Sequence, residues 1–392
     1  MTIGYLARSY LEMRTIIGCV REAVYVKVRN WDQLIAIYVL GKLLRLNRRF
    51  AALELQFYNS YHGNPRCDVL HCFNTTSWTK TPWVVTFETM VPRYEGVIRV
   101  ADRSKMPYDR RVGRALDQMA GSSCVALVAM SDCAAKMQRK LHARYKIASL
   151  DKKLFVLHPP QKVLVDHVET KTFLKNRPSV SGVFIGKEFF RKGGWESFKA
   201  TERVNNELGY DAIRLTVVST LQYGGYAEHP DAAIMKDEFL AAVSKYSWLT
   251  HHTYIENSEL LKRLPGYDFG LLPSHADTYG FSVLELQAAG LPVVTTNVRA
   301  LPEINNADCG WVIPVPIDGS GEACYSTRVE VENLERCIID QCYEVMKRIA
   351  LNPAEELKDK GRRALERIKR EHDPARYGQR MEEIYERRNL LP

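Results

Sequence analysis

Short apolar runs, rich in β-branched and aromatic residues, recur along the 392-residue chain and alternate with stretches of helical periodicity. Such near-continuous apolar strands between helices are typical of parallel sheets that are covered on both faces. The runs form two sets, and the chain is longer than one hydrophobic core normally serves. We therefore predict an α/β protein of two doubly wound domains, with ligands at the carboxyl ends of the strands. The runs span 53–59, 68–74, 83–89, 125–131 and 153–159 in the first set, and 180–186, 213–219, 249–255, 268–274, 292–298 and 309–315 in the second.

The stretch 161–179 lies between the two sets of runs and is predicted to link the domains. We place an N-terminal domain at 1–165 and a C-terminal domain at 166–392. The tail from Pro353 to Leu391 is charged and helical in pattern. Its last helix, at about 375–390, is a candidate for packing back on the N-terminal domain.

Composition excludes several classes of protein. With 46% hydrophobic and 10% aromatic residues the chain can bury sizeable cores, so it is not disordered. It has no run of about 18 apolar residues, as a membrane-spanning helix requires, and its first residues lack the pattern of a signal peptide. The nine cysteines form no CxxC pair. We expect buried or incidental thiols in a reducing compartment, and therefore a cytoplasmic protein.

The positive charge is concentrated in one half of the chain. Residues 1–170 hold 26 Lys and Arg against 14 Asp and Glu, whereas residues 171–392 hold 29 against 32. A basic half suggests an anionic partner, which could be nucleic acid, an anionic membrane surface or a phosphate-bearing substrate. A merely soluble surface is the remaining interpretation.

Residues 273–290 place Asp277 in a polar loop and Glu285 inside the helix that follows. Gly280 marks the start of that helix, where a ligand can approach the main chain and the free N–H groups favour an anionic group. Phosphate at those amides, a ribose diol on Glu285 and a sugar near Asp277 together describe a nucleotide-sugar donor. Two other interpretations are open: Asp277 could be the N-cap of the helix, and Glu285 could be a solvated surface residue.

A second polar segment follows the strand that ends at Gly186. It carries three cations, Lys187, Arg191 and Lys192, and then a glycine pair. This arrangement predicts a clamp for a diphosphate. It lacks the GK[ST] ending of a P-loop, so it is not an ATPase signature. The alternative is an exposed basic loop.

The stretch LLPSHADTYGFSVLELQAAGLPVVTTNVRALPEI resembles the acidic–x7–acidic signature of retaining glycosyltransferases of the GT4 family, which have the GT-B fold. Residues 183–194, VFIGKEFFRKGG, are similar to the basic segment of the same family. The resemblance implies two Rossmann-like domains facing a central cleft, with the donor in the C-terminal one. Asp277 stands where the family has its first Glu, so the charge is kept and the reach is one methylene shorter. The donor-binding residues implied are Lys187, Arg191, Lys192, Tyr279, Gly280, Phe281 and Glu285, and Pro302-Glu303 matches a later PE pair.

The first half matches the family in outline only. Its runs at 68–74, 83–89 and 125–131 follow the family's order of strands, but no glycine-rich loop follows the first strand. Glu88 stands where many family members have His. We take Glu88 as a catalytic candidate beside Asp277, in contact with the sugar or the acceptor, while a loop cap is the alternative.

The resemblance also implies the chemistry. The acceptor attacks the anomeric carbon on the face that the nucleotide leaves, so the sugar is transferred with retention. Fixed cations and the amides of the helix start stabilise the leaving diphosphate, and Asp277 aligns the sugar. Because this clamp is cationic and the sequence has no evident DxD pair, we expect neither a metal nor any other cofactor.

The acceptor side is predicted from charge. Residues 31–50 form a basic amphipathic stretch that ends in Lys42, Arg45, Arg48 and Arg49, and it suits either a membrane surface or a core helix. Residues 93–114 add seven Lys and Arg against three acids. We expect a glycan or lipid-linked acceptor, a role in surface polysaccharide or glycolipid assembly, and peripheral attachment to the inner face of the membrane. The alternatives are a nucleic-acid-binding protein, although no RNA- or DNA-binding signature is present and we expect no nucleic acid, and a nucleotide-sugar epimerase.

Overall fold

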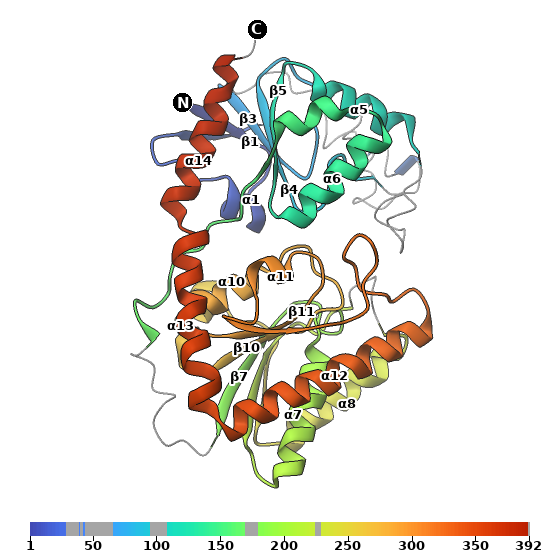
Figure 1. Ribbon diagram of the computed structural model, residues 1–392, viewed down its shortest axis with the longest axis vertical. Coiled ribbons are helices and arrows are strands. Elements are labelled where there is room, and N and C mark those ends of the chain that lie inside the picture. The colour runs from blue at the N-terminus through green and yellow to red at the C-terminus, as the bar shows by residue number, and fades with distance from the viewer. Residues whose placement is uncertain are drawn as a thin grey trace. The chain divides into compact units, whose positions relative to one another are not determined.

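The computed structural model describes residues 1–28, 39, 42–43, 66–94, 108–168, 179–223 and 229–390 (Figure 1). The chain divides into two compact units, one of Met1–Pro160 with His372–Pro392 and the other of Gln161–Glu371. The predicted strand at 53–59 lies outside the described residues, as do most of 31–50, most of 93–114 and residues 169–178 of the predicted linker. No helix in the described part is long and apolar enough to cross a membrane.

The first unit is built on a parallel sheet with the strand order β2-β1-β3-β4-β5-β6. Successive side chains of a strand point to opposite faces, so Val84 of β4 enters one core with helix α14, and Val85 enters another with helices α5 and α6. Helices therefore cover both faces of this sheet. The elements are β1 (Thr2–Tyr5), α1 (Tyr10–Thr15), β2 (Val24–Lys27), β3 (Val69–Phe73), β4 (Trp83–Phe87), α5 (Arg110–Ala120), β5 (Cys124–Ala129), α6 (Asp132–Arg144), the 3-10 helix η2 (Ala148–Lys153), β6 (Leu154–Val156), α14 (Pro374–Glu386) and the 3-10 helix η6 (Arg387–Leu390).

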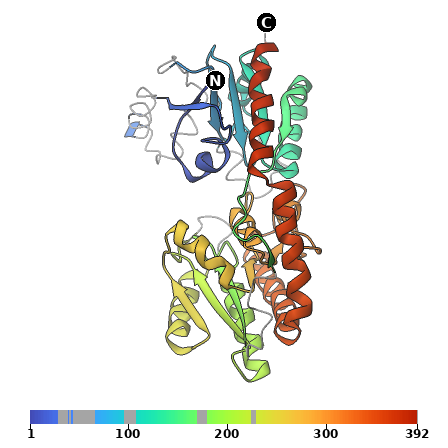
Figure 2. The same cartoon turned by 90° about the vertical axis from the view of Figure 1, so that its left-hand side faces the viewer.

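Helix α14 is the last α-helix of the chain, yet it packs on the sheet of the first unit (Figures 1 and 2). The hydroxyl of Tyr377 donates to the carbonyl of Thr15 at 2.8 Å. The Tyr385 hydroxyl lies 2.6 Å from Nδ1 of the buried His71. At Gly378 a Cβ atom would lie 2.3 Å from a main-chain carbonyl oxygen, so a glycine is needed where the helix approaches the first unit this closely.

The second unit is also a parallel sheet, with the strand order β12-β11-β10-β7-β8-β9. Helix α7 packs on α12, and α10 packs on α13. The elements are β7 (Val180–Ile185), α7 (Gly194–Leu208), β8 (Ile213–Val218), α8 (Ala232–Lys245), β9 (Leu249–His252), α9 (Asn257–Arg263), the 3-10 helix η5 (Leu264–Gly266), β10 (Phe269–Leu272), α10 (Phe281–Ala288), β11 (Val293–Thr296), α11 (Leu301–Ile304), β12 (Gly310–Ile313), α12 (Arg328–Leu351) and α13 (Pro353–Glu371).

The strand order of the second sheet locates its ligand site. From β7 the chain adds β8 and β9 on one side, and then returns to add β10, β11 and β12 on the other side. The order therefore reverses between β7 and β10, and ligands of doubly wound sheets bind at the carboxyl ends of the strands at such a switch point. Two segments lie there, residues 186–193 after β7 (the β7 loop) and residues 273–280 after β10 (the β10 loop).

Each predicted run within the described residues contains or overlaps a strand, so these predictions are confirmed. The sequence reasoning missed β1 and β2, because Gly4 interrupts the apolar residues of β1 and the edge strand β2 has no buried residue.

Candidate functional site

The β7 and β10 loops are joined by several hydrogen bonds. The main-chain N–H of His275 donates to the carbonyl of Arg191 at 2.9 Å, and the Arg191 guanidinium donates to the carbonyl of Ala276 at 2.9 Å. At Gly193, where φ is 82°, a Cβ atom would lie 2.1 Å from the carbonyl oxygen of Pro273. Only glycine fits this left-handed, crowded position. The two loops therefore act as one support for the side chains they carry.

Asp277 is buried in the β10 loop and forms an ion pair with Lys192 of the β7 loop. Its Oδ1 accepts a hydrogen bond from the main-chain N–H of Tyr279 at 3.1 Å. Burial by itself raises the pKa of this carboxyl, but Lys192 outweighs burial and the pKa is held below its usual value. The N-cap of α10 is Gly280, so the alternative interpretation of Asp277 as the helix N-cap is wrong.

The three cations of the predicted clamp have different surroundings. The Lys187 side chain is exposed, and its carbonyl accepts bonds from the loop that follows β8. Arg191 is buried and forms an ion pair with Glu188, in addition to its bond to the β10 loop. Lys192 is paired with Asp277. The segment is therefore not simply an exposed basic loop, because two of its cations are engaged by carboxylates.

Gly280 begins helix α10 with φ at 97°, and a Cβ atom there would lie 2.7 Å from Cδ2 of Leu301. The left-handed φ therefore demands glycine at this position even without a ligand, and it lies against α11, which holds the Pro302-Glu303 pair. Tyr279 is fully buried and Phe281 is half-buried, and their ring centroids are 5.4 Å apart. This aromatic pair holds the start of the helix.

Glu285 lies in the second turn of α10 and is only 5% exposed. Its burial shows that the interpretation as a solvated surface residue is wrong. A carboxylate is costly to bury unless it has polar partners, so its presence in this apolar helix is unusual.

Glu88 belongs to the first unit, directly after β4, and is buried. Its main-chain N–H donates to the Asn74 side-chain oxygen at 3.1 Å, and Asn74 itself has a φ of 54°. The main chain of Glu88 thus ties the loop after β4 to the loop after β3.

Two pairings in this site were missed in the sequence. Glu188, in the β7 loop, engages Arg191. His275 Nε2 lies 2.6 Å from Glu196 Oε1, and both side chains are only 2% exposed. A usable signal was present, because Glu196 is an acidic residue within the aromatic stretch GWESF.

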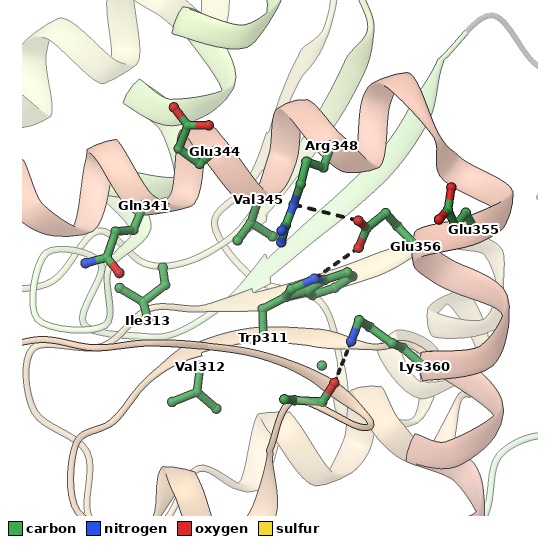
Figure 3. A pocket seen from close by; sticks show the side chains of 12 residues that line it. Trp311, Val312, Ile313, Gln341, Glu344, Val345, Arg348, Glu355, Glu356 and Lys360 are labelled. Atoms are coloured by element: carbon green, nitrogen blue, oxygen red, sulfur yellow. Dashed lines mark hydrogen bonds and ion pairs between the residues drawn. The ribbon is translucent and has the colours of Figure 1, made fainter.

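The second unit also has a hollow of about 670 Å³ that none of the β7- or β10-loop residues line (Figure 3). It lies between β12, the edge strand of the sheet, and helices α12 and α13. Trp311 Nε1 donates to Glu356 at 3.3 Å, and Arg348 lies 3.7 Å from the same carboxylate. Lys360 donates to the Ala307 carbonyl. These polar groups are therefore already engaged by other groups of the protein, and the hollow lies apart from the β7 and β10 loops.

The segment that carries both loops matches a known protein family. Residues 183–323 match the family model described as "Glycosyl transferases group 1". Two curated proteins named glycogen synthase, from Mycobacterium tuberculosis strains CDC 1551 / Oshkosh and H37Rv, are each 28% identical to the chain over 142 residues, which is 36% of this chain. The aligned segment spans 31% of the length of these relatives.

Solved structures resemble the whole chain. A UDP-forming α,α-trehalose-phosphate synthase from Burkholderia xenovorans has a TM-score of 0.60 at 10% identity, with 98% of each chain covered. Anabaena HepE, solved with UDP and glucose, has a TM-score of 0.56 at 11% identity, also with 98% of each chain covered. WaaG, a glycosyltransferase involved in lipopolysaccharide biosynthesis, has a TM-score of 0.57 at 15% identity, covering 98% of this chain and 99% of WaaG. The predicted fold class is confirmed: the protein has the GT-B fold of two parallel-sheet α/β domains.

Proposed function

We propose that the protein is a retaining glycosyltransferase of the GT4 type whose donor is a nucleotide-diphosphate sugar. One observation carries the proposal: Lys192 pairs with Asp277 at the switch point of the second sheet, inside the segment that matches group 1 glycosyltransferases. A cation and an ionised carboxylate that meet there suit a diphosphate and the hydroxyl groups of a sugar.

In the proposed reaction the bond from the anomeric carbon to the diphosphate breaks, and a bond to the acceptor oxygen forms on the same face. The acceptor proton passes to the departing phosphate oxygen. Lys187, Arg191 and Lys192 stabilise the negative charge that develops on the diphosphate. The diphosphate competes with Asp277 for Lys192, which leaves the ionised Asp277 to accept hydrogen bonds from the sugar. This exchange couples donor binding to sugar alignment.

A ligand panel tests the proposal. The chain is heated with UDP-glucose, GDP-mannose, ADP-glucose and the free nucleosides, and release of the nucleoside diphosphate is then assayed. One nucleotide sugar should stabilise the fold by roughly 2.7 kcal/mol at a hundredfold excess over its dissociation constant. Stabilisation by DNA or RNA and by no nucleotide sugar would overturn the proposal. Conversion of the donor to an epimer would point to the epimerase alternative.

We infer a glycan or lipid-linked acceptor, with Glu88 of the first unit in contact with the acceptor or the sugar. Its support is the position of Glu88 after a strand of the first sheet and the positive charge of residues 1–170. Surface polysaccharide or glycolipid assembly, in the cytoplasm at the inner face of the membrane, would suit such an acceptor.

Vesicle binding tests the membrane part of this proposal. The protein is expected to bind vesicles rich in anionic lipid, to ignore neutral ones and to be released by salt, because each Lys or Arg near an anionic surface contributes about 1 kcal/mol. Replacing Arg45, Arg48 and Arg49 together with Gln should weaken the binding and leave donor affinity unchanged. If wild type ignored anionic vesicles at low salt, the cations would be reassigned to a soluble anionic acceptor.

Chelation tests the expectation that no metal takes part. Turnover is expected to survive EDTA, because the proposed clamp supplies fixed cations in place of a divalent ion. The control is EDTA treatment followed by excess Mg²⁺, which should not raise the rate. Abolition by EDTA with recovery on adding Mg²⁺ would contradict the metal-free scheme.

Replacing Glu285 with Gln should weaken the binding of UDP, because a neutral amide accepts less strongly from the ribose hydroxyls. The expected loss is about 1–3 kcal/mol, the range for a hydrogen bond to a charged group. Pyrophosphate has no ribose, so its affinity should stay the same and serves as the matched control. Equal affinities of the folded variant and wild type for UDP would remove Glu285 from the site.

A further inference from the structure

The buried side chains of His275 and Glu196 form a pair at the two loops. His275 is in the β10 loop, two residues before Asp277, and Glu196 is in the first turn of α7, just after the β7 loop. Their side chains meet at 2.6 Å from Nε2 to Oε1. The pair therefore connects the interior of the second unit to both loops at once.

This buried ion pair is expected to contribute little net stability to the fold. Within the described residues, Nδ1 of His275 and Oε2 of Glu196 are buried and have no hydrogen-bond partner. Desolvating an ion pair without satisfying its remaining polar atoms often costs as much as the pair contributes. Apolar side chains of similar volume would fill the same space at no such cost, so a role other than stability is indicated.

The surrounding charges favour the imidazolium form of His275. Burial by itself lowers the pKa of His275, but Glu196, together with Glu335 of α12, outweighs it and the pKa is raised. Glu335 is held by two further contacts, a bond from Trp195 Nε1 at 2.9 Å and a contact with His229 Nε2 at 3.1 Å. His275 thus faces two acids, one from each of the helices α7 and α12.

Hydrogen bonds between the two loops connect the position of His275 to that of Asp277. The main-chain N–H of His275 donates to the main-chain carbonyl of Arg191, and the carbonyl of the next residue, Ala276, accepts from the Arg191 guanidinium. The residue after that is Asp277, which meets Lys192. A shift of His275 away from Glu196 would therefore move Asp277 relative to the cations of the β7 loop.

We propose that His275 is a positioning residue whose ion pair with Glu196 holds Asp277 in register with Lys192, an inference that rests on the proposed function of these loops. The pair has a pH dependence that follows from its charge. The favourable interaction of the protonated imidazole with Glu196 is present in full below the pKa of an unfolded histidine. That stabilisation is lost as pH rises through the raised folded-state pKa of His275. Among the described residues, the charged groups that act on His275 are Glu196 and Glu335, and Glu335 is itself in contact with the titratable His229.

His275→Gln tests the inference, because Gln keeps an N–H donor near the place of Nε2 and removes the charge. The first probe is UDP-glucose, or the best donor of the panel in its place. We expect kcat to fall by about tenfold or more, because small misplacements of aligning groups lower the rate by such factors. The dissociation constant of UDP should change less than about threefold, since the cations remain. Wild type should lose kcat at alkaline pH, and the variant should lack this pH limb.

The control is His142→Gln. His142 is also buried and lies 2.7 Å from an acid, Asp151, but it belongs to the first unit. This variant should lose stability and keep the alkaline limb. In a double-mutant cycle, His275→Gln combined with Glu196→Gln should cost kcat no more than the larger single effect, because both remove the same pair.

Hydrogen–deuterium exchange makes the test independent of activity. The main-chain N–H of Tyr279, bonded to Asp277, should exchange at least about tenfold faster in His275→Gln but not in His142→Gln. An active wild type with unchanged kcat, pH limb and exchange in His275→Gln would overturn the positioning role. A wild type that binds and turns over no nucleotide sugar would overturn the proposed function instead, and the exchange of the β10 loop would still decide whether His275 holds it.

Discussion

Replacing Asp277 with Asn is expected to lower kcat by about a hundredfold or more, because the aligning carboxylate acts in the transition state. The affinity for UDP should not fall with it. In the free protein Asp277 is paired with Lys192, so removing its charge leaves the cation available to the donor diphosphate. Turnover and affinity measured on one preparation should therefore move apart.

A merely structural Asp277 would behave differently. Its side chain accepts the Tyr279 N–H, and Asn can keep that bond. If Asp277 only held the loop through this bond, the substitution would cost at most about 1 kcal/mol of stability and leave kcat unchanged. The melting temperature adds a second readout. Because Lys192 lowers the pKa of Asp277, the pair stabilises wild type above the pKa of an unfolded Asp and is lost as pH falls through the lowered value. The Asn variant should lack this acid-dependent loss.

Replacing Lys192 with Ala is expected to weaken UDP and pyrophosphate alike, by about 1.5–3 kcal/mol, the range for hydrogen bonds to charged groups. Uridine, which has no phosphate, should bind as before. The comparison is made by calorimetry on the three ligands. Lys358→Ala is the matched control, since Lys358 lies exposed on α13 of the same unit. Equal losses for uridine and UDP would mean that Lys192 does not contact phosphate.

The same variant leaves Asp277 buried without its cation, which is costly for a carboxylate. We therefore expect Lys192→Ala to destabilise the protein, and the double variant Lys192→Ala with Asp277→Asn to regain part of that stability. Urea denaturation of the four proteins measures the coupling between the two residues. Additive losses would show that the pair contributes nothing.

Local pattern was sufficient for much of the fold. Strands such as β5 and β10 are short apolar runs between helices. Every residue of these strands is buried, because both faces of the sheet are covered, so most of their residues are apolar. The β7 and β10 loops were identified for a similar reason, since their cations, glycines and Asp277 occupy two short segments. The strands β1 and β2 were missed because Gly4 interrupts the apolar residues of β1 and no residue of the edge strand β2 is buried.

Other features depended on residues that are far apart along the chain. Lys192 and Asp277 are 85 positions apart, and His275 and Glu196 are 79 apart. No periodicity links such positions, so only the strand order, which brings β7 beside β10, reveals the pairs.

The sequence by itself therefore determined the two α/β domains and the residue types of the candidate donor site, because each depends on neighbours within a few positions. The tertiary structure alone decided which charges meet, that Gly280 rather than Asp277 caps α10, and which residues of α14 pack on the first sheet. These outcomes depend on burial and close approach between distant segments. Their energies arise only once the sheets are assembled.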